Sequence, residues 1–458
     1  RTTLARIRLL MYADDIVLVA ETTKEMNQHL QTVAEWAKKY ELEINTQKTE
    51  TILINTRNNP KVVYQEKELK TTNNFKYLGY VVNKRCTNKN HMEERITKTK
   101  AALKHTFSIL RRLHSIKMTQ KKVIADSLIT QVATYAQEAA HKSKVNKTTE
   151  ETLDRIQRKA ARHILRVPQQ SAIETTLEDL GWLPIKDIVN KRTLNFYRKI
   201  SKSHRSSVYH KVLQIAKDEN LPMVARANKL QEKYGLNAES CTEDWNKELE
   251  TAVRRHRRQQ NIRHSLAKKT CEDFLNVSSF HGQVKARDYV QFNSHRLDEI
   301  AAIHRWRAGH SDARSTRFIR HIEPDPNCTW CKQEETVEHI LEHCPKNRIP
   351  REKLRTIARK YFEPREALIY QLVLESDKLE EERDQLTTRQ KEKIDREIKN
   401  YVNIIIKTRK TPQEETQEEA QEENETTRPS TQEETRKRKR TEDQKPTKKH
   451  KKNHPVEA

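Results

Sequence analysis

The chain has 458 residues and a formal net charge of +25, which leaves room for two or three domains and favours a polyanionic partner. Solubility alone is the alternative explanation of the charge. With only 5 glycines and 34% apolar residues, the composition predicts long helices rather than a compact α/β enzyme. No stretch approaches the ~18 consecutive apolar residues of a membrane helix, and no signal-like N-terminus is present, so neither a membrane nor a secretory destination is expected.

The first strong pattern is Tyr12-Ala13-Asp14-Asp15, inside an apolar run at residues 9–19. Strand-forming, buried-looking residues on both sides predict a β-hairpin with two carboxylates at its tip. Such a pair suits the binding of divalent metal ions in nucleotidyl transfer, and a solvated turn is the alternative. A helix is predicted next, because Thr22 and Glu25 have capping-box spacing. Apolar residues then recur at helical intervals, at Met26, Leu30, Val33 and Ala37.

Two further segments follow in order. Asn45 and Lys48 precede an apolar strand at residues 51–54, and a second strand pattern, which contains Gly79, covers residues 75–82. Each segment taken singly is weak evidence, because an apolar strand with a glycine is usually only a strand. In order and spacing, however, the three segments resemble the last three palm motifs of non-LTR (LINE-type) retrotransposon reverse transcriptases. These motifs are the aspartate hairpin, the Asn-x-x-Lys-Thr segment and the primer grip.

The resemblance implies catalytic roles for three residues. Asp14 and Asp15 would ligate two Mg²⁺ ions, one lowering the pKa of the primer 3′-hydroxyl and the other neutralising the leaving pyrophosphate. Asp14 matches the invariant ligand of the family, and Asp15 is more peripheral. Lys48 would lie near the triphosphate and assist the departing pyrophosphate. A solvated lysine beside a strand is the alternative.

The resemblance also implies a primer grip made of Phe75, Leu78 and Gly79. Gly79 would let the backbone approach the primer strand closely, with Phe75 and Leu78 packed beneath, and simple core is the alternative. Such polymerases need fingers and a further aspartate from an earlier palm strand, and neither can precede Arg1. We therefore expect the C-terminal portion of a longer polyprotein that binds Mg²⁺ poorly and is inactive alone.

Helical patterns dominate residues 88–300, and residues 91–112 resemble the start of the family's thumb. The clearest amphipathic helix is predicted at residues 152–167. Its apolar face consists of Leu153, Ile156, Ala160, Ile164 and Val167. Its cationic stripe consists of Arg155, Arg158, Lys159, Arg162 and Arg166. The thumb-like location favours phosphate contact over a merely solvated face. Gly181 is predicted to end a later helix, and residues 254–258 form a further basic cluster of unassigned orientation.

A metal-ligand pattern occurs at Cys328, Cys331, His339 and Cys344, with spacing C-x2-C-x7-H-x4-C. Three thiolates and an imidazole form a closed tetrahedral set that suits structural Zn²⁺. Disulfides are the alternative, although the other cysteines, Cys86, Cys241 and Cys271, are scattered. His343, one helical turn after His339, could compete as a ligand.

With residues 305–310 before it and residues 335–345 around its histidine, this pattern resembles the C-terminal CCHC module of non-LTR retrotransposon polyproteins. In that family the module helps to grip template RNA or target DNA during target-primed reverse transcription. The resemblance spans residues 4–347. Nothing after Pro345 suggests a restriction-enzyme-like nuclease, so the resemblance is closer to elements with an apurinic-endonuclease-like domain at the far N-terminus.

The tail has a different composition. A charged helix is expected over residues 376–408, and the Gln/Glu/Thr-rich segment 411–435 is expected to be disordered. Basic blocks at residues 436–440 and 448–452 favour nuclear import, with nonspecific nucleic-acid contact or a solvated tail as the alternative. The expected localisation is nuclear, with a cytoplasmic ribonucleoprotein stage.

The expected fold is mainly α, with a small α+β palm remnant, a helical thumb and linker, a zinc knuckle and a disordered tail. The domains are expected at 1–87 (palm), 88–180 (thumb), 181–300 (linker), 301–350 (CCHC module), 351–410 (charged helices) and 411–458 (tail). Two functions stay open. One is part of an RNA-directed DNA polymerase acting on template RNA and target DNA. The other is a truncated or domesticated protein that binds nucleic acid through its thumb and zinc knuckle without polymerising.

Overall fold

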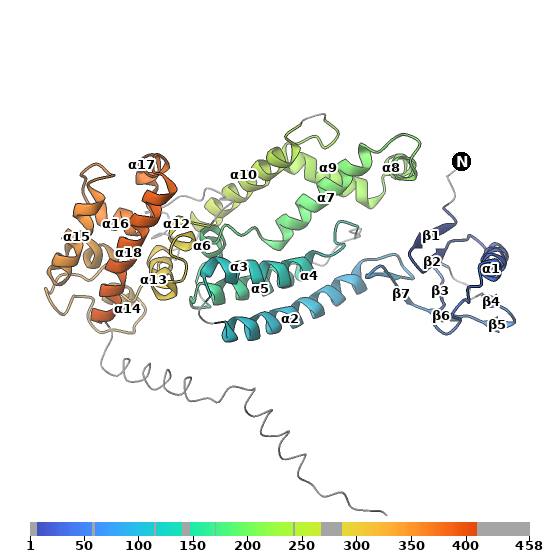
Figure 1. Ribbon diagram of the computed structural model, residues 1–458, viewed down its shortest axis with the longest axis horizontal. Coiled ribbons are helices and arrows are strands. Elements are labelled where there is room, and N and C mark those ends of the chain that lie inside the picture. Colours follow the sequence, from blue (N-terminus) through green and yellow to red (C-terminus); the bar gives the residue numbers. More distant parts are fainter. Residues whose placement is uncertain are drawn as a thin grey trace, which may run out of the picture. The chain divides into compact units, whose positions relative to one another are not determined.

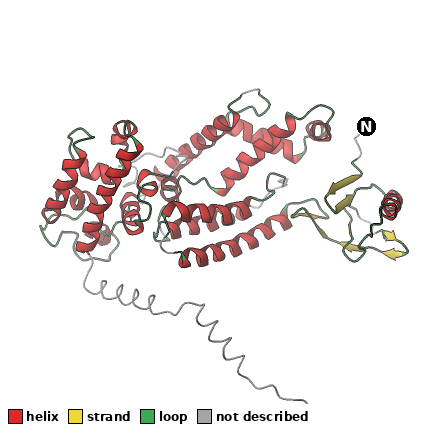
Figure 2. Cartoon of the chain, in the orientation of Figure 1, coloured by secondary structure: helices red, strands yellow, loops and turns green. Residues whose placement is uncertain are grey.

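A computed structural model describes residues 7–56, 60–113, 116–139, 147–169, 171–240, 243–266 and 286–409 (Figure 1). Helices predominate, and among the described residues the strands are confined to positions 9–83 (Figure 2), so the expected mainly α fold is confirmed. Residues 1–403 form one compact unit. The described helices include no candidate for a membrane span. The expected tail at 411–458, with both basic blocks, lies outside the described residues, as do Cys241 and Cys271.

The described residues up to position 83 form four two-stranded sheets and one helix. The strands are β1 (Leu9–Tyr12), β2 (Asp15–Leu18), β3 (Glu50–Ile52), β4 (Val63–Tyr64), β5 (Lys67–Glu68), β6 (Lys70–Thr72), β7 (Asn74–Tyr77) and β8 (Tyr80–Asn83). β1–β2, β4–β5 and β7–β8 are antiparallel hairpins, whereas β3 and β6 pair in parallel. A small core forms where α1 (Thr23–Lys39) packs on β4, and its buried residues include Leu30 and Tyr64.

Helix α1 begins as its sequence predicts. The Thr22 hydroxyl accepts a hydrogen bond from the backbone N–H of Glu25 at 3.1 Å. The Glu25 carboxylate accepts one in return from the N–H of Glu21 at 3.0 Å, one residue earlier than in the standard capping box. Leu30 and Ala37 are buried on the predicted apolar face, and Met26 is half-buried against the same core.

Helices predominate in the described residues between positions 89 and 266. They are α2 (Lys89–Arg112), α3 (Met118–Ala125), the π-helical turn η1 (Asp126–Thr130), α4 (Gln131–Thr134), α5 (Lys147–Ile164), α6 (Ile173–Asp179), α7 (Ile185–Ser201), α8 (Val208–Asp218), α9 (Pro222–Tyr234) and α10 (Trp245–Leu266). α2 packs against both α4 and α5. α6 ends as predicted, because Gly181 has a φ of 57° and the N–H of Trp182 bonds back to the carbonyl of Leu177.

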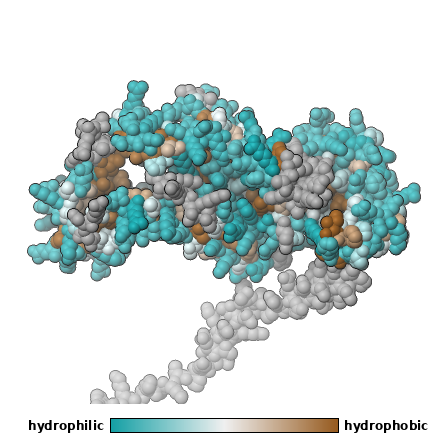
Figure 3. All heavy atoms as spheres, turned by 180° about the vertical axis from the view of Figure 1, so that it is seen from behind, coloured by the Kyte–Doolittle hydropathy of each residue, from teal (hydrophilic) through white to brown (hydrophobic). Residues whose placement is uncertain are grey.

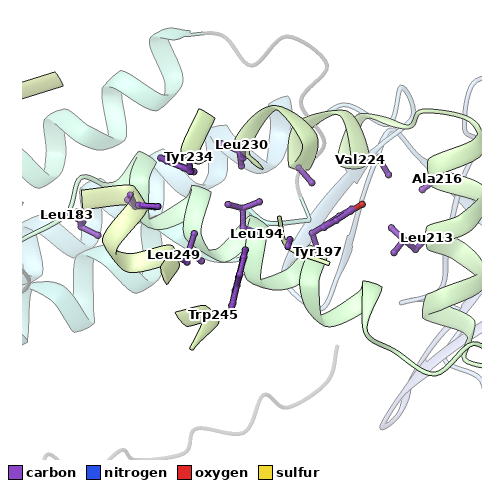
Figure 4. Close-up of a cluster of buried hydrophobic side chains, with 14 residues drawn as sticks. Leu183, Leu194, Tyr197, Leu213, Ala216, Val224, Leu230, Tyr234, Trp245 and Leu249 are labelled. Carbon is purple, nitrogen blue, oxygen red and sulfur yellow. The ribbon is translucent and has the colours of Figure 1, made fainter. Parts of the chain in front are cut away.

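A second core is shared by α7, α8, α9 and α10 (Figure 4). Leu194, Tyr197 and Leu213 meet Trp245 and Leu249 there, all nearly inaccessible to solvent. The polar atoms of the aromatic residues are satisfied at the edge of this core. The Trp245 indole donates to Asn195 and the Tyr197 hydroxyl to Glu239. Helices α7 to α10 thus share a buried core in the region expected to be a linker, and α7 also packs against α4 and α5.

The described C-terminal part, residues 286–409, is also helical. Its elements are α12 (Asp288–Gln291), α13 (Leu297–Arg307), α14 (Arg314–Ile319), the π-helical turn η3 (His339–His343), η4 (Pro345–Asn347), α15 (Arg348–Ala358), α16 (Leu368–Val373), η5 (Asp377–Leu379), α17 (Glu380–Asp384) and α18 (Thr388–Arg409). The expectation of one continuous helix over 376–408 is wrong. The chain breaks at residues 385–387 because Thr387 and Gln390 form a reciprocal capping box that starts α18.

Candidate functional site

The aspartate hairpin is present and its two carboxylates lie at the tip. Tyr12 pairs with Asp15 across the hairpin, which leaves Ala13 and Asp14 as a two-residue loop. Ala13 has a φ of 53°, a conformation that glycine usually supplies in such loops. Asp14 and Asp15 are both exposed. The strands are less buried than the pattern suggested, since all four residues of β1 are exposed in the described chain.

Two exposed carboxylates are an incomplete set for a protein-bound Mg²⁺, which takes six oxygen ligands. Among the described residues, no group of three or more His, Cys, Asp or Glu side chains includes Asp14 or Asp15. Their position at a hairpin tip leaves both accessible to a metal ion that is also held by other groups. The arrangement can therefore contribute ligands to a shared metal site.

The loop before β3 carries Lys48 and is shaped by Asn45. The Asn45 side-chain oxygen accepts hydrogen bonds from the N–H groups of Gln47 and Lys48, both at 3.1 Å. The Asn45 carbonyl accepts from the Thr49 hydroxyl at 2.8 Å. This Asx turn explains why asparagine and threonine flank the lysine. The Lys48 side chain is exposed, so the turn presents its ammonium group to solvent.

The segment expected to be a primer grip is the β7–β8 hairpin. Phe75 pairs with Val82 within the ladder and is half-buried. Leu78 and Gly79 form the loop, with φ values of 45° and 79°, the pattern of a type I′ turn. The expectation that Leu78 packs beneath the turn is wrong, because it is 42% exposed. A left-handed φ costs a non-glycine residue about 1–2 kcal/mol, so this loop is strained at Leu78.

Helix α5 carries the expected cationic stripe, and its members have different surroundings. Arg155 and Lys159 are exposed, and Arg158 is half-buried. Arg162 donates two hydrogen bonds to the Ser171 carbonyl, at 2.7 and 3.1 Å. Arg166 forms an ion pair with Asp298 at 2.6 Å. Within the described chain, only Arg155, Arg158 and Lys159 of the stripe therefore present a charged group that has no hydrogen-bonded partner. The predicted apolar face is buried at Leu153, Ile156, Ala160 and Ile164.

The structure brings Cys328, Cys331, His339 and Cys344 together. Their ligand atoms all lie within 4.8 Å of one another. The Cys328 and Cys344 sulfurs are 3.9 Å apart, and Cys331 Sγ is 3.3 Å from His339 Nε2. With metal–ligand bonds of ~2.0–2.3 Å, the edges of a zinc tetrahedron are roughly 3.3–3.8 Å. The donor set and its spacing therefore fit Zn²⁺.

The alternative ligand His343 lies outside this group. Its Nε2 is 3.8 Å from the Glu338 carboxylate and its side chain is half exposed. The π-helical turn η3 explains why Cys344 joins the cluster and His343 does not. In this turn the Cys344 N–H donates to the carbonyl of His339, five residues earlier. That wider turn brings Cys344 back beside the cysteine knuckle. Burial and the adjacent Cys328 raise the pKa of the Cys344 thiol to about 11, which a bound cation would reverse.

The surroundings of the cluster come from well beyond residue 350. Arg351 donates to the Cys344 carbonyl at 2.9 Å, and the Tyr401 hydroxyl donates to the Leu341 carbonyl at 2.8 Å. Glu342 accepts from the backbone N–H groups of Ile369 and Tyr370. The segment 301–350 is thus built into a larger helical body rather than packed only on itself.

A buried ionic cluster was missed by the sequence interpretation. The Asp179 carboxylate, fully buried at the end of α6, lies 2.8 Å from His304 Nδ1 and 3.2 Å from Arg307 Nε. It also accepts from the Tyr289 hydroxyl at 2.7 Å. Burial would raise the pKa of Asp179, but Arg307, His304 and Arg287 together lower it well below its usual range. These partners lie 108 to 128 residues from Asp179 along the chain, so no periodic pattern in the sequence reveals them.

Comparison with known proteins finds a similarity for the N-terminal residues. Residues 1–82, which contain the aspartate hairpin, the Lys48 loop and most of the β7–β8 hairpin, match the family of reverse transcriptases (RNA-dependent DNA polymerases). The expected resemblance to non-LTR retrotransposon reverse transcriptases is confirmed, and the family match lies in the N-terminal part of the chain.

One similar protein is the Retrovirus-related Pol polyprotein from type-1 retrotransposable element R1 of Nasonia vitripennis. It is 25% identical to this chain over 191 residues, which cover 39% of the chain and 57% of the relative. The chain thus matches little more than half of that curated protein.

Proposed function

We propose that this chain works in reverse transcription by a non-LTR retrotransposon, with Asp14 and Asp15 as ligands of catalytic Mg²⁺. The observation that carries the proposal is the exposed carboxylate pair at the tip of a hairpin within the family-matched residues. When bound, Mg²⁺ would lower the pKa of a primer 3′-hydroxyl and neutralise the leaving pyrophosphate. Lys48, presented by its Asx turn, would supply positive charge beside the leaving group.

The proposal includes a dependence on a further carboxylate. Nucleotidyl transfer by two metal ions needs protein ligands on both sides of the two ions. Two adjacent aspartates supply only part of such a ligand set. We therefore expect residues 1–458 alone not to extend a primer on an RNA template. A chain joined to the preceding part of a reverse transcriptase domain should do so.

The decisive measurement is template-dependent primer extension by both forms, with Asp14→Asn in the longer one. Loss of extension on Asp14→Asn supports the catalytic role. Robust extension by residues 1–458 alone would contradict the need for a further ligand. Nucleic-acid binding without extension by either form would favour the second function, a binding protein without polymerase activity.

Nucleic-acid binding forms the second part of the proposal. The +25 charge and the side chains of Arg155, Arg158 and Lys159 favour contact with phosphates of template RNA or target DNA. Replacing these three residues by glutamine should flatten the slope of log affinity against log salt by about two to three units. Arg162→Gln is the internal control, because its guanidinium already serves the Ser171 carbonyl. An unchanged slope in the triple variant would assign the stripe to solvent.

We further propose that the Cys₃His cluster binds one structural Zn²⁺ and that the protein acts in the nucleus. Protein side chains fill all four coordination positions, which leaves no open position for catalysis.

Nuclear import through the basic blocks at 436–440 and 448–452 can be tested by the localisation of a tagged chain that lacks both blocks. Retention in the nucleus would contradict that role for the blocks.

A further inference from the structure

A single tyrosine holds the strained turn of the β7–β8 hairpin. Tyr135, which directly follows α4, donates a hydrogen bond from its hydroxyl to the Leu78 carbonyl at 2.6 Å. A Cβ atom added at Gly79 would lie 3.0 Å from the Tyr135 ring and 3.2 Å from its hydroxyl. Both loop residues therefore contact the same side chain. Gly79 is needed here for its φ of 79° and also because the tyrosine ring occupies the adjacent space.

Helix α2 fixes that tyrosine and the hairpin together. The Arg95 guanidinium lies over the Tyr135 ring, 5.3 Å from its centroid. His91 is fully buried, and its Nε2 lies 3.1 Å from the Tyr135 carbonyl. The His91 Nδ1 accepts from the N–H of Val81 at 3.5 Å, and the ring packs on Tyr80 with centroids 4.4 Å apart. His91 thus bridges strand β8 to the backbone of Tyr135.

These contacts leave one side of the Leu78–Gly79 turn accessible to solvent. Leu78 is 42% exposed and Tyr135 is 44% exposed, although the Leu78 carbonyl and the Gly79 backbone are both covered by the tyrosine. The turn is therefore anchored on one side and accessible on the other. A loop that must present its residues to a bound strand needs this combination, because an unanchored strained loop would relax to several conformations.

We propose that Tyr135 is a positioning residue that holds the Leu78–Gly79 turn in register for the 3′ end of a primer strand. The proposal rests on the proposed function, since it takes this turn as a primer contact. It adds a residue from the helical region, 56 positions after Gly79, to the part of the chain that matches reverse transcriptases.

The first experiment tests the anchor without any nucleic acid. Hydrogen exchange of residues 74–83 is compared between the full chain and its Tyr135→Phe variant, which keeps the ring and removes the donor. Exchange should become about fivefold faster, the factor that corresponds to the net ~1 kcal/mol of one hydrogen bond. Tyr209→Phe, at a tyrosine that is 69% exposed on α8, is the matched control and should change nothing. Unchanged exchange in Tyr135→Phe would overturn the proposal.

The second experiment links the anchor to the primer. The full chain is bound to an RNA template annealed to a DNA primer whose 3′-terminal base is 2-aminopurine. Tyr135→Phe should leave the Kd within about twofold, because phosphate contacts carry affinity. It should also shift the terminal-base fluorescence toward that of the free duplex.

Leu78→Asp separates the two possible failures. A terminal-base signal that does not respond to Leu78→Asp shows that the turn is not a primer contact, and the proposed function of the turn then fails. A signal that responds to Leu78→Asp but not to Tyr135→Phe overturns the role of Tyr135 alone. Gly79→Ala should reproduce the effect of Tyr135→Phe, and the double variant should be less than additive because both changes break one contact.

Discussion

The hairpin that carries Asp14 and Asp15 and the helical region around Asp179 use the same side chain in opposite ways. At the hairpin both carboxylates are exposed, and the structure gives them no buried partner. Asp179 is fully buried and surrounded by Arg307, His304 and Tyr289. An exposed carboxylate is available to a ligand from outside, whereas a buried and paired carboxylate stabilises the fold. Substitutions should therefore affect function at the hairpin and stability in the helical region.

The largest effect is expected at the Cys₃His cluster. Cys328→Ser or Cys344→Ser should abolish the binding of one Zn²⁺ per chain and unfold the surrounding segment, because zinc binding contributes on the order of 10 kcal/mol in small zinc-folded peptides. Zinc content and thermal unfolding of the full chain would report this. The exposed Cys86→Ser is the matched control, and His343→Ala should be mild. Zinc-free wild-type protein, purified under reducing conditions, would contradict the assignment.

Asp179→Asn should cost about 3–5 kcal/mol of unfolding free energy, because it removes the carboxylate that pairs directly with the buried Arg307 guanidinium. Asp298→Asn removes the partner of another arginine, Arg166, but Asp298 is 74% exposed. That change should cost at most about 1 kcal/mol. Denaturant unfolding of both variants compares the loss of an aspartate–arginine pair in the buried and in the exposed environment. Equal effects would show that burial does not distinguish them.

Asp154 sharpens the comparison, because it is half-buried and accepts a backbone hydrogen bond from the N–H of Lys186 at 3.3 Å instead of pairing with an arginine. Burial raises its pKa to about 6 from 3.8, so the folded state holds the proton more tightly than the unfolded state between those values. Its contribution to stability is therefore greatest below pH 4, declines as the pH rises to 6, and is then constant. Asp154→Asn should raise the unfolding free energy at pH 7.5 by at most about 3 kcal/mol and leave it unchanged at pH 4.

The exposed Glu151→Gln on the same helix is the control for Asp154→Asn. Unfolding by urea at both pH values measures the difference. A variant whose stability changes equally at pH 4 and pH 7.5 would show that packing, rather than titration of Asp154, causes the effect.

The smallest effect on stability is expected at the hairpin itself. Asp14→Asn and Asp15→Asn remove exposed charges that bond to nothing in the described chain, so each should change the unfolding free energy by less than about 0.5 kcal/mol. The same substitutions should abolish extension by the longer polymerase. A destabilisation comparable with that of Asp179→Asn would show that the hairpin carboxylates are structural.

The sequence by itself determined the features that depend on nearby residues. The aspartate hairpin, the cap of α1 at Thr22, the buried face of α5 and the end of α6 at Gly181 all follow from spacing within a few residues. The zinc ligands were predicted for the same reason, since all four lie within 17 residues. The capping box at Thr387 was also readable, and it would have divided the helix expected over 376–408.

Only the tertiary structure decided which side chains are available and which are already used. Arg162 and Arg166 look like the other members of their stripe, yet one bonds to Ser171 and the other to Asp298. The sequence predicts a packed side chain at Leu78, but Leu78 is exposed because it lies in the loop of the β7–β8 hairpin. Tyr135 meets Gly79, and Asp179 meets Arg307, across 56 and 128 residues of chain. Contacts over such distances depend on how separate helices pack, and no local periodicity records them.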